Sequence, residues 1–326
     1  MPSPLISIVI PTCNRPDLLQ RAIASVMAQT FTAWEILVVI NGSDTVTAVT
    51  LEQIQDKRLQ WLQIAEAGAS HARNAGVNAA NTDWIAFLDD DDEWLPEKLE
   101  KQWKLVKNNS AQYSIISSQL IARTPKGDFV RPRRFPGDRE SISDYLLGRT
   151  SFFQGEGLVQ TSTILTQRQL LLQVPFRQLP KHQDWDWMLR ALSASDVQLK
   201  FVPEVLAIWY LEEKRRSVSS QVNWQHSLTW IRQNRALVTP QAYAAFLLVE
   251  VGSQAAQSRV RSQFIPLLKE AFQQGKPNAI VLLLYLAMWL LPIETRRSIR
   301  AKLTRRSAQS HSEPQSIPMA IVERIN

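Results

Sequence analysis

Short apolar runs alternate with helical patterns along the first 110 residues of the chain. These runs are too short for helices, and the first is rich in β-branched residues, so they predict strands that are largely buried within a sheet. The expected strands cover residues 6–10, 35–40, 59–64 and 84–88. Helices are expected over 18–27, with Pro16 at the start, and over the Ala-rich stretch 69–80. Strands that alternate with helices indicate a mostly parallel α/β sheet with helices on both faces.

Four consecutive carboxylates, Asp89, Asp90, Asp91 and Asp92, directly follow the strand expected at 84–88. Like charges this close repel, so keeping all four ionised at neutral pH is costly unless a cation lies among them. Carboxylate oxygens at a strand end suit Mg²⁺ or Mn²⁺. The chain then enters a helix expected to begin at Pro96. A strand, an acidic turn and a helix form the place where open α/β sheets bind ligands, although an acidic surface loop that caps the helix is an alternative.

Beyond residue 110 the pattern is less regular. A strand is expected over 113–122, a loop over 123–140 and a strand at the sheet edge over 161–165. A later helix carries an apolar stripe at helical spacing, formed by Trp185, Met188, Leu189 and Leu192. Asp184 lies in its first turn and is either a functional carboxylate or an N-cap. Asp186 is expected only to favour the positive end of the helix dipole.

The C-terminal part changes character. Helices are expected over 242–257 and 259–274, and Pro277 is expected to open a third that contains the uncharged run 280–291. A bilayer span needs about 20 apolar residues, so this run does not predict one. Two interpretations remain: a buried helix, or a helix at a membrane interface with Trp289 at headgroup depth. We expect a main domain over 1–230, a helical extension over 231–305 and a disordered tail over 306–326.

The chain of 326 residues has the apolar (45%) and charged (21%) content of a globular protein. Cys13 is the single cysteine, which excludes an internal disulfide and fits a reducing compartment. No secretory signal is expected before the first strand, so we expect a cytoplasmic location. Net charge is +7, and residues 296–306 hold six basic side chains and no acidic one. Because no aromatic residues interleave them, no nucleic acid is expected, and an anionic membrane surface suits this basic run better. Peripheral membrane contact through 277–306 is thus one of the two interpretations of this region, beside the buried helix.

Five segments taken together resemble family 2 glycosyltransferases. They are ISIVIPTCNR (6–15), VINGS (39–43), ARN (72–74), FLDDDDEW (87–94) and QDWDWMLR (183–190). The resemblance implies the GT-A fold, a three-layer α/β/α arrangement around a mixed, mostly parallel sheet, here with a C-terminal helical extension. It also implies an inverting reaction, a nucleotide-sugar donor, and Mn²⁺ or Mg²⁺ bound through a DxD motif.

Carried over to this chain, the resemblance gives roles to single residues. Pro11 and Thr12 would lie against the donor nucleotide, Arg73 against the nucleotide or its phosphates, and Asp90 near the ribose or a phosphate. Asn41 stands where the family usually has an acid that pairs with the base. An amide can still pair with uracil or thymine, so the resemblance favours UDP or dTDP.

The other matched positions concern the metal and the reaction. Asp91 would be the direct metal ligand, with Asp89 in the same motif, and Asp184 the general base. The acceptor-side residues would be Thr161, Ser162, Thr163 and Trp185. Gln183 replaces the acid that usually precedes the base, and residues 208–213 give no match to the Arg-x-His element that could supply a third metal ligand.

The expected function is therefore transfer of a sugar to a saccharide or lipid-linked acceptor in cell-surface polysaccharide or lipopolysaccharide assembly, with an acceptor pocket built by 123–180. A sugar nucleotidyltransferase would carry a Gly-rich loop after its first strand, where this chain has Pro11 to Arg15. A catalytically inactive nucleotide-sugar-binding protein and a membrane-docked scaffold are also compatible with these residues.

Overall fold

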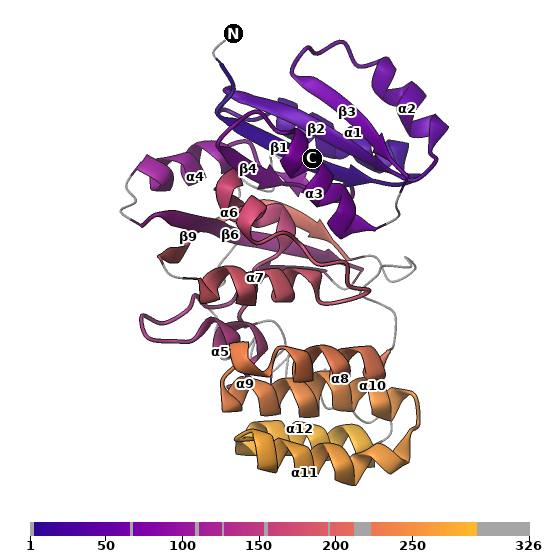
Figure 1. The fold of residues 1–326 in the computed structure, drawn as a ribbon, viewed down its shortest axis with the longest axis vertical. Helices are drawn as coiled ribbons and strands as arrows, with labels where there is room; N and C mark the ends of the chain where they lie inside the picture. Colours follow the sequence, from indigo (N-terminus) through magenta and orange to yellow (C-terminus); the bar gives the residue numbers. More distant parts are fainter. Residues whose placement is uncertain are drawn as a thin grey trace.

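The computed structural model describes residues 3–65, 68–107, 111–125, 127–152, 156–194, 196–211 and 223–291. Within these residues, nine strands form one sheet in the order β3-β2-β1-β4-β8-β6-β9-β5, with β7 paired to β6 (Figure 1). The strands are β1 (Ile6–Thr12), β2 (Trp34–Asn41), β3 (Leu59–Ile64), β4 (Trp84–Phe87), β5 (Glu93–Trp94), β6 (Tyr113–Thr124), β7 (Gly127–Arg131), β8 (Leu165–Gln167) and β9 (Val197–Tyr210).

The sheet is mixed but mostly parallel, as expected. Strands β3, β2, β1 and β4 run in one direction. Strand β8 is antiparallel to its neighbours β4 and β6, and β6 and β9 are parallel to each other. The N-terminal helices are α1 (Pro16–Met27), α2 (Thr45–Glu52), α3 (Ala69–Ala79), α4 (Lys98–Lys107), α5 (Ile142–Leu147), α6 (Arg168–Gln173) and α7 (Gln183–Ser193).

Alternate side chains of β1 enter two different cores, because successive residues of a strand point to opposite faces. Ile8 packs in the cluster that contains Leu19 of α1, whereas Val9 packs in the cluster that contains Val77 of α3. The glycine of α3 allows close approach, since a Cβ on Gly76 would lie 2.4 Å from Val9 Cγ1. Helices therefore cover both faces of the sheet, which makes the expected three layers.

Two expected boundaries near the start of the chain were wrong. Strand β1 does not stop at Pro11 but continues to Thr12, paired with β2. Its other neighbour, β4, leaves the pairing at Phe87, opposite Val9, so Pro11 lies beyond the end of that ladder. Helix α4 begins at Lys98, after the short strand β5 and a turn at Pro96. Helix α2 was not expected, because β-branched residues dominate it.

Two expectations in the middle of the chain were also wrong. Residues 123–140 are not all loop, because β6 extends to Thr124 and forms a hairpin with β7. Charged residues hid this strand, and Arg123 and Asp128 form an ion pair across the hairpin. Residues 161–165 are not an edge strand. They form a 3-10 turn (Thr161–Thr163) that leads into β8, inside the sheet between β4 and β6.

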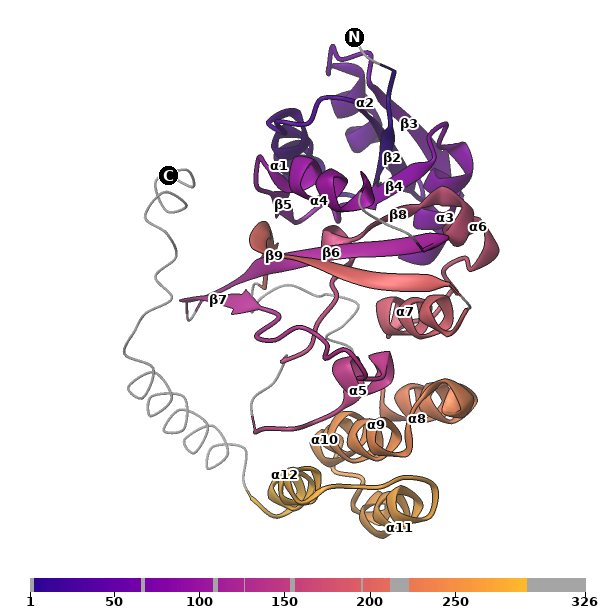
Figure 2. The same cartoon turned by 90° about the vertical axis from the view of Figure 1, so that its left-hand side faces the viewer.

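Helices of the C-terminal part pack in layers below the sheet and α7 (Figures 1 and 2). They are α8 (Trp224–Gln233), α9 (Pro240–Ala245), a π-helical segment (Phe246–Val251), α10 (Gly252–Gln257), α11 (Phe264–Gln274) and α12 (Ala279–Leu290). Pro277 does not open α12, because Asn278 caps it by accepting a hydrogen bond from the Val281 N–H. In the described part of the chain, no helix is both long and apolar enough to cross a membrane.

One continuous core joins these helices to the sheet. The same buried cluster contains Phe87 of β4, Trp187 of α7, Trp230 of α8 and Tyr285 of α12. The expected domain boundary at residue 230 stays a prediction. The buried cluster contains residues from both sides of that boundary. The basic run 296–306 and the tail 306–326 lie outside the described residues.

Candidate active site

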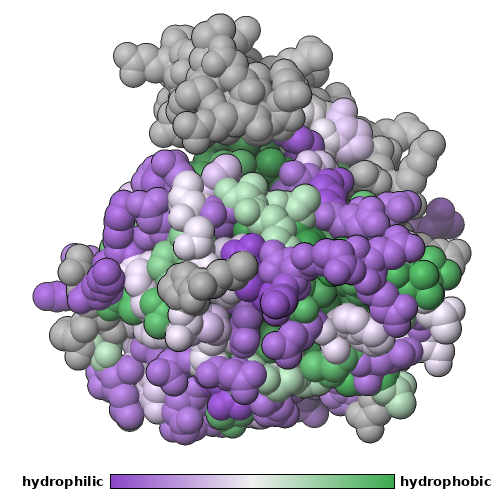
Figure 3. All heavy atoms as spheres, turned by 90° about the horizontal axis from the view of Figure 1, so that it is seen from above, coloured by the Kyte–Doolittle hydropathy of each residue, from purple (hydrophilic) through white to green (hydrophobic). Residues whose placement is uncertain are grey.

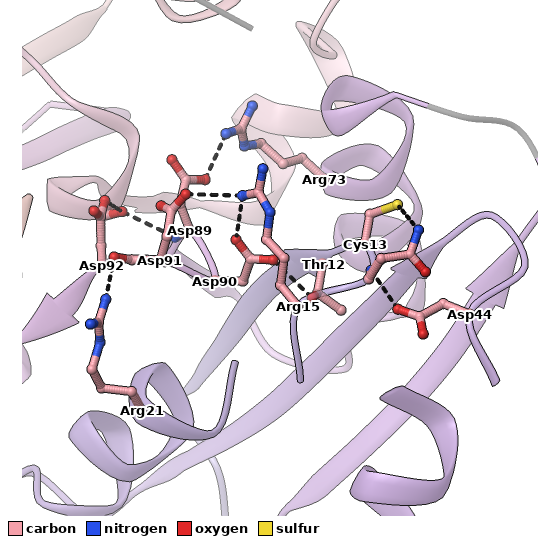
Figure 4. A network of polar contacts seen from close by, with 12 residues as sticks. Thr12, Cys13, Arg15, Arg21, Asp44, Arg73, Asp89, Asp90, Asp91 and Asp92 are labelled. Atoms are coloured by element: carbon pink, nitrogen blue, oxygen red, sulfur yellow. Dashed lines mark hydrogen bonds and ion pairs between the residues drawn. The ribbon is translucent and has the colours of Figure 1, made fainter. Parts of the chain in front are cut away.

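Polar residues meet where the parallel strands end, because parallel strands present their carboxyl ends at one edge of a sheet. Thr12 ends β1, Asn41 ends β2, and the acidic cluster (Asp89, Asp90, Asp91 and Asp92) follows β4. Figure 4 shows these carboxylates facing the loop after β1 and two arginines from different helices. The Thr12 hydroxyl donates to Asp90 Oδ2 over 2.9 Å. This edge of the sheet is therefore a candidate site.

Asp90 is buried and connects the acidic cluster to the loop after β1. Its Oδ1 lies 3.2 Å from Nη1 of Arg15, and the same nitrogen lies 3.1 Å from Asp91 Oδ2. Burial raises the pKa of Asp90, and the Arg15 charge and the Thr12 hydrogen bond partly oppose this rise. Pro11 lies just before these contacts, inside β1.

A buried arginine connects the acidic cluster to α7. The Arg73 side chain is 7% exposed, and its Nη2 lies 2.7 Å from Asp89 Oδ1. Its Nη1 donates to Gln183 Oε1 over 3.3 Å. Burial alone would lower the pKa of Arg73, but the charges of Asp89 and Asp184 outweigh burial and raise it. The side chain is therefore held cationic between β4 and the first turn of α7.

Asp184 faces this arginine from the first turn of α7. The N-cap of α7 is His182, without a side-chain cap, so the alternative that Asp184 caps this helix is wrong. Burial raises the pKa of Asp184, while the Arg73 charge lowers it and the Asp89 charge raises it further. A carboxylate with a raised pKa is suited to proton transfer near neutral pH.

Asp92 belongs to the site in a way that the sequence did not reveal. Its Oδ2 accepts hydrogen bonds from Ser162 Oγ at 2.6 Å and Gln160 Nε2 at 2.8 Å. Its buried Oδ1 has no hydrogen-bond partner among the described residues. Burial and the nearby Asp89 charge raise the pKa of Asp92, in spite of those two donors.

Three carboxylates could hold a metal ion together. Oxygen atoms of Asp89, Asp91 and Asp92 all lie within 4.8 Å of one another. All-oxygen ligands suit a hard cation such as Mg²⁺ or Mn²⁺, and the unpartnered Asp92 oxygen is what a cation would complete. The residues therefore fit the expected metal. In the sequence, the only sign that Asp92 is a candidate metal ligand is its position directly after the DxD segment.

The acceptor-side residues are placed differently from one another. Ser162 donates to Asp92 and accepts from the Asp89 N–H, and the Thr163 hydroxyl donates to the Gln160 carbonyl, so both support the acidic cluster from the inside. Thr161 is buried near Asp184 and lowers its pKa. Trp185 packs on the C-terminal helices, where it stacks on His182 with 5.2 Å between ring centroids. Their acceptor role stays a prediction.

Asn41 and Asp44 both support loops around the site. Asn41 Oδ1 accepts a hydrogen bond from the Gly68 N–H over 3.0 Å, at the start of α3, so this oxygen already has one partner. Its pairing with a base stays a prediction. Asp44 was not expected to act here, yet its Oδ2 accepts from the Asn14 N–H over 2.6 Å and its Oδ1 from the Thr47 N–H. A capping aspartate thus fixes the loop after β1.

The expectation for Asp186 was wrong. It is not merely a dipole-favouring acid, because its side chain is buried and bonded to Arg190 Nε at 2.7 Å and Trp230 Nε1 at 3.2 Å. Its contact with Trp230 directs it toward α8. Asp186 therefore anchors the helix that carries Asp184.

A hollow of about 530 Å³ lies elsewhere, between α8, α9 and α11. Glu270 in its wall is already bonded to Arg232 and Tyr243. Because the carboxylate of this hollow is already neutralised by Arg232, we place the candidate site at the acidic cluster.

The fold and this site define a class: an α/β protein with an acidic cluster and a buried arginine at the carboxyl edge of its mixed sheet. The family model for "Glycosyl transferase family 2" matches residues 7–171, about half of the chain. The protein therefore belongs to glycosyltransferase family 2, as its motifs suggested.

Two similar proteins carry names that describe glycosyl transfer. The chain is 28% identical over 239 residues to the amylovoran biosynthesis glycosyltransferase AmsB of Erwinia amylovora, which covers 69% of this chain and 76% of that protein. It is 36% identical over 136 residues to WfgD of Escherichia coli, a UDP-Glc:alpha-D-GlcNAc-diphosphoundecaprenol beta-1,3-glucosyltransferase, covering 40% of this chain and 52% of that protein.

A solved structure has the same fold. The TarS 1-349 structure from S. aureus superposes with a TM-score of 0.53 at 15% identity, over 90% of this chain and 91% of that one. This likeness confirms the expected GT-A architecture.

Proposed function

We propose that this protein is an inverting, metal-dependent glycosyltransferase that moves a sugar from a nucleoside diphosphate to a saccharide or lipid-linked acceptor in cell-surface polysaccharide assembly. One observation carries the proposal. The buried Arg73 interacts with Asp89 of the candidate metal site on one side and with Asp184 of α7 on the other. In this proposal one arginine would connect the leaving-group site to the general base.

The acidic cluster would serve the leaving diphosphate. Asp91, Asp89 and Asp92 would hold Mn²⁺ or Mg²⁺, which when bound neutralises the negative charge that develops on the leaving oxygens. Asp92 would thus be a third metal ligand, in addition to Asp89 and Asp91, which the sequence indicates.

Asp184 would act as the general base. The acceptor hydroxyl must lose its proton as its oxygen attacks the anomeric carbon, and the raised pKa of Asp184 brings its proton affinity closer to the working pH. One base on the face opposite the leaving group gives inversion. Arg73 would keep this carboxylate ionised before the acceptor binds.

The donor would lie along the carboxyl edge of β1 and β2. We assign its contacts to Pro11, Thr12, Asn41, Arg73 and Asp90. A uracil or thymine base is favoured, because Asn41 offers an amide. The name of WfgD includes a UDP-Glc donor and a lipid-linked acceptor, and a TarS structure contains UDP-GlcNAc, which supports UDP as the first nucleotide to test.

The C-terminal helices would contact an anionic membrane surface. Leu283, Leu286 and Leu290 of α12 are 54%, 38% and 70% exposed, on the side opposite the buried Val281 and Tyr285. A helix that is apolar on all its faces is usually buried on all of them, so the exposed face of α12 is expected to contact another apolar surface. The six basic residues of 296–306 that come next in the sequence complement anionic lipid.

The function is tested by release of nucleoside diphosphate. The protein is incubated with UDP-glucose or UDP-GlcNAc, with Mn²⁺ or with EDTA, and a range of saccharide and lipid-linked acceptors. We expect acceptor-dependent UDP release that requires the metal. Tight UDP binding without any turnover would instead favour an inactive donor-binding protein.

A further inference from the structure

Arg15 occupies a position that the donor and the metal both require. Its Nη1 lies between Asp90 Oδ1 and Asp91 Oδ2, at 3.2 and 3.1 Å (Figure 4). Asp91 is one of the three carboxylates that could hold a metal ion. The carboxylate needed by the cation is therefore already in contact with a guanidinium.

Arg15 is free to move in a way that Arg73 is not. The Arg15 side chain is 36% exposed, whereas that of Arg73 is 7% exposed. Arg15 stands before the first turn of α1 and makes no side-chain cap there. Arg73 belongs to α3 and is fixed by Asp89 and Gln183. The Arg15 side chain is therefore less enclosed than that of Arg73.

A third arginine makes a purely structural contact with the acidic cluster. Arg21 donates to the backbone oxygen of Asp91 over 2.8 Å and pairs with Glu93 over 3.0 Å. The Arg21 hydrogen bond to Asp91 is thus made to the backbone oxygen, whereas that of Arg15 is made to the carboxylate.

Charge determines how Arg15 responds when the metal and the donor bind. A divalent cation and a guanidinium on the same carboxylate repel each other, so each weakens the binding of the other. A diphosphate offers the guanidinium a new anionic partner with several oxygens, to which arginine binds well.

We propose that Arg15 binds the diphosphate of the donor and, before the donor arrives, occupies Asp91, a candidate metal ligand, together with the neighbouring Asp90. This inference rests on the proposed function, because it needs a nucleoside diphosphate at this site. The consequence is cooperative binding. The nucleotide draws the positive charge of Arg15 away from Asp91, which favours the metal there, and the metal in turn displaces Arg15 toward the diphosphate.

Mn²⁺ binding tests this directly, by electron paramagnetic resonance of the free ion with and without UDP. We expect UDP to tighten Mn²⁺ binding to the wild-type protein by about tenfold, within the usual range of coupling between linked ligands. Arg15→Gln should bind Mn²⁺ alone more tightly than the wild type, bind UDP more weakly, and lose most of the coupling.

Arg21→Gln is the matched control. Both variants remove one positive charge beside Asp91, but Arg21→Gln removes a hydrogen bond to its backbone oxygen, whereas Arg15→Gln removes one to its carboxylate. We expect Arg21→Gln to keep the coupling of the wild type. Equal Mn²⁺ affinity in wild type and Arg15→Gln, or a coupling that survives in Arg15→Gln, would overturn the role of Arg15 alone. A wild-type protein that binds neither Mn²⁺ nor UDP would contradict the proposed function itself.

Discussion

A single buried guanidinium organises the chemistry at the scale of the residue. Arg73 is bonded to Asp89 and lowers the pKa of Asp184, so carboxylates from two distant parts of the sequence share one positive charge. A buried charge without a partner is costly, so the three side chains depend on one another. We infer that the alanine and arginine of the ARN motif have distinct tasks: Ala72 packs in the core while Arg73 holds the site.

Asp184→Asn should remove the base but leave the donor site intact. The loss of a general base reduces kcat by about 10²-fold or more. UDP affinity should change much less, because Asp184 acts on the donor site only through its charge interactions with Arg73 and Asp89. Steady-state kinetics and UDP titration measure the two effects.

Asp83→Asn provides the control, because Asp83 is exposed at the entry to β4. It should retain wild-type kcat. An Asp184→Asn enzyme with nearly wild-type kcat would rule out the role of Asp184 as base.

Helix α7 shows how an element is held in place for function. Its N-cap, His182, has a left-handed φ of 67° and lies between the rings of Trp185 and Trp230. Its Nε2 lies 2.8 Å from Ser227 Oγ of α8. Asp186 adds a second bond to α8 through Trp230. The C-terminal helices thus set the position of Asp184.

The pH dependence of stability tests this anchor. Burial, with the Lys181 and His226 charges, lowers the pKa of His182 to about 3. As pH falls below the unfolded value of about 6.5, protons bind the unfolded chain preferentially, so His182 costs up to about 1.4 kcal/mol per pH unit until its folded pKa is reached.

His182→Asn tolerates the left-handed conformation and removes this titration. Between pH 6.5 and 5, we expect its free energy of unfolding to fall less steeply than that of the wild type, as measured by urea denaturation. Identical slopes would show that His182 can be protonated in the folded protein.

The sequence predicted the elements whose pattern is set by local physics. Buried strands such as β2 and β4 are apolar runs, and α1 has a regular apolar stripe, so both could be predicted. Strand β8 could not be predicted, because it has only three residues and becomes a strand by pairing with β4 and β6, which lie far from it in the sequence. For the site, adjacent carboxylates indicated Asp89 and Asp91. The roles of Asp92, Asp44 and Arg15 depend on contacts between residues far apart in the sequence.

The whole molecule has two ends of different character. The face over the N-terminal end carries many hydrophilic side chains with smaller apolar groups among them (Figure 3). At the opposite end, α12 exposes three leucines, and α11 exposes Ile265 and Phe272 at 64% and 58%. A membrane contact at this end would hold the enzyme beside a lipid-linked acceptor.

Replacing Leu283 and Leu290 together by Gln should weaken sedimentation with phosphatidylcholine–phosphatidylglycerol vesicles by about tenfold or more, because burial of each leucine contributes about 1.5–3 kcal/mol. Pure phosphatidylcholine vesicles should bind less of the wild type, since they lack the anionic charge.

The paired control is Val46→Gln with Val49→Gln, which alters two exposed residues of α2 at the other end. Equal vesicle binding by both double variants would contradict a membrane contact through α12.

The most direct test of the central claim is thermal stabilisation by nucleotides. The intact protein and Asp91→Ala are heated with UDP, dTDP, GDP or CDP, each with and without Mn²⁺. We predict that UDP or dTDP raises the Tm of the intact protein only when Mn²⁺ is present, and that Asp91→Ala loses this rise. No rise with any nucleotide, or a rise that needs neither Mn²⁺ nor Asp91, would contradict a metal-dependent donor site at the acidic cluster.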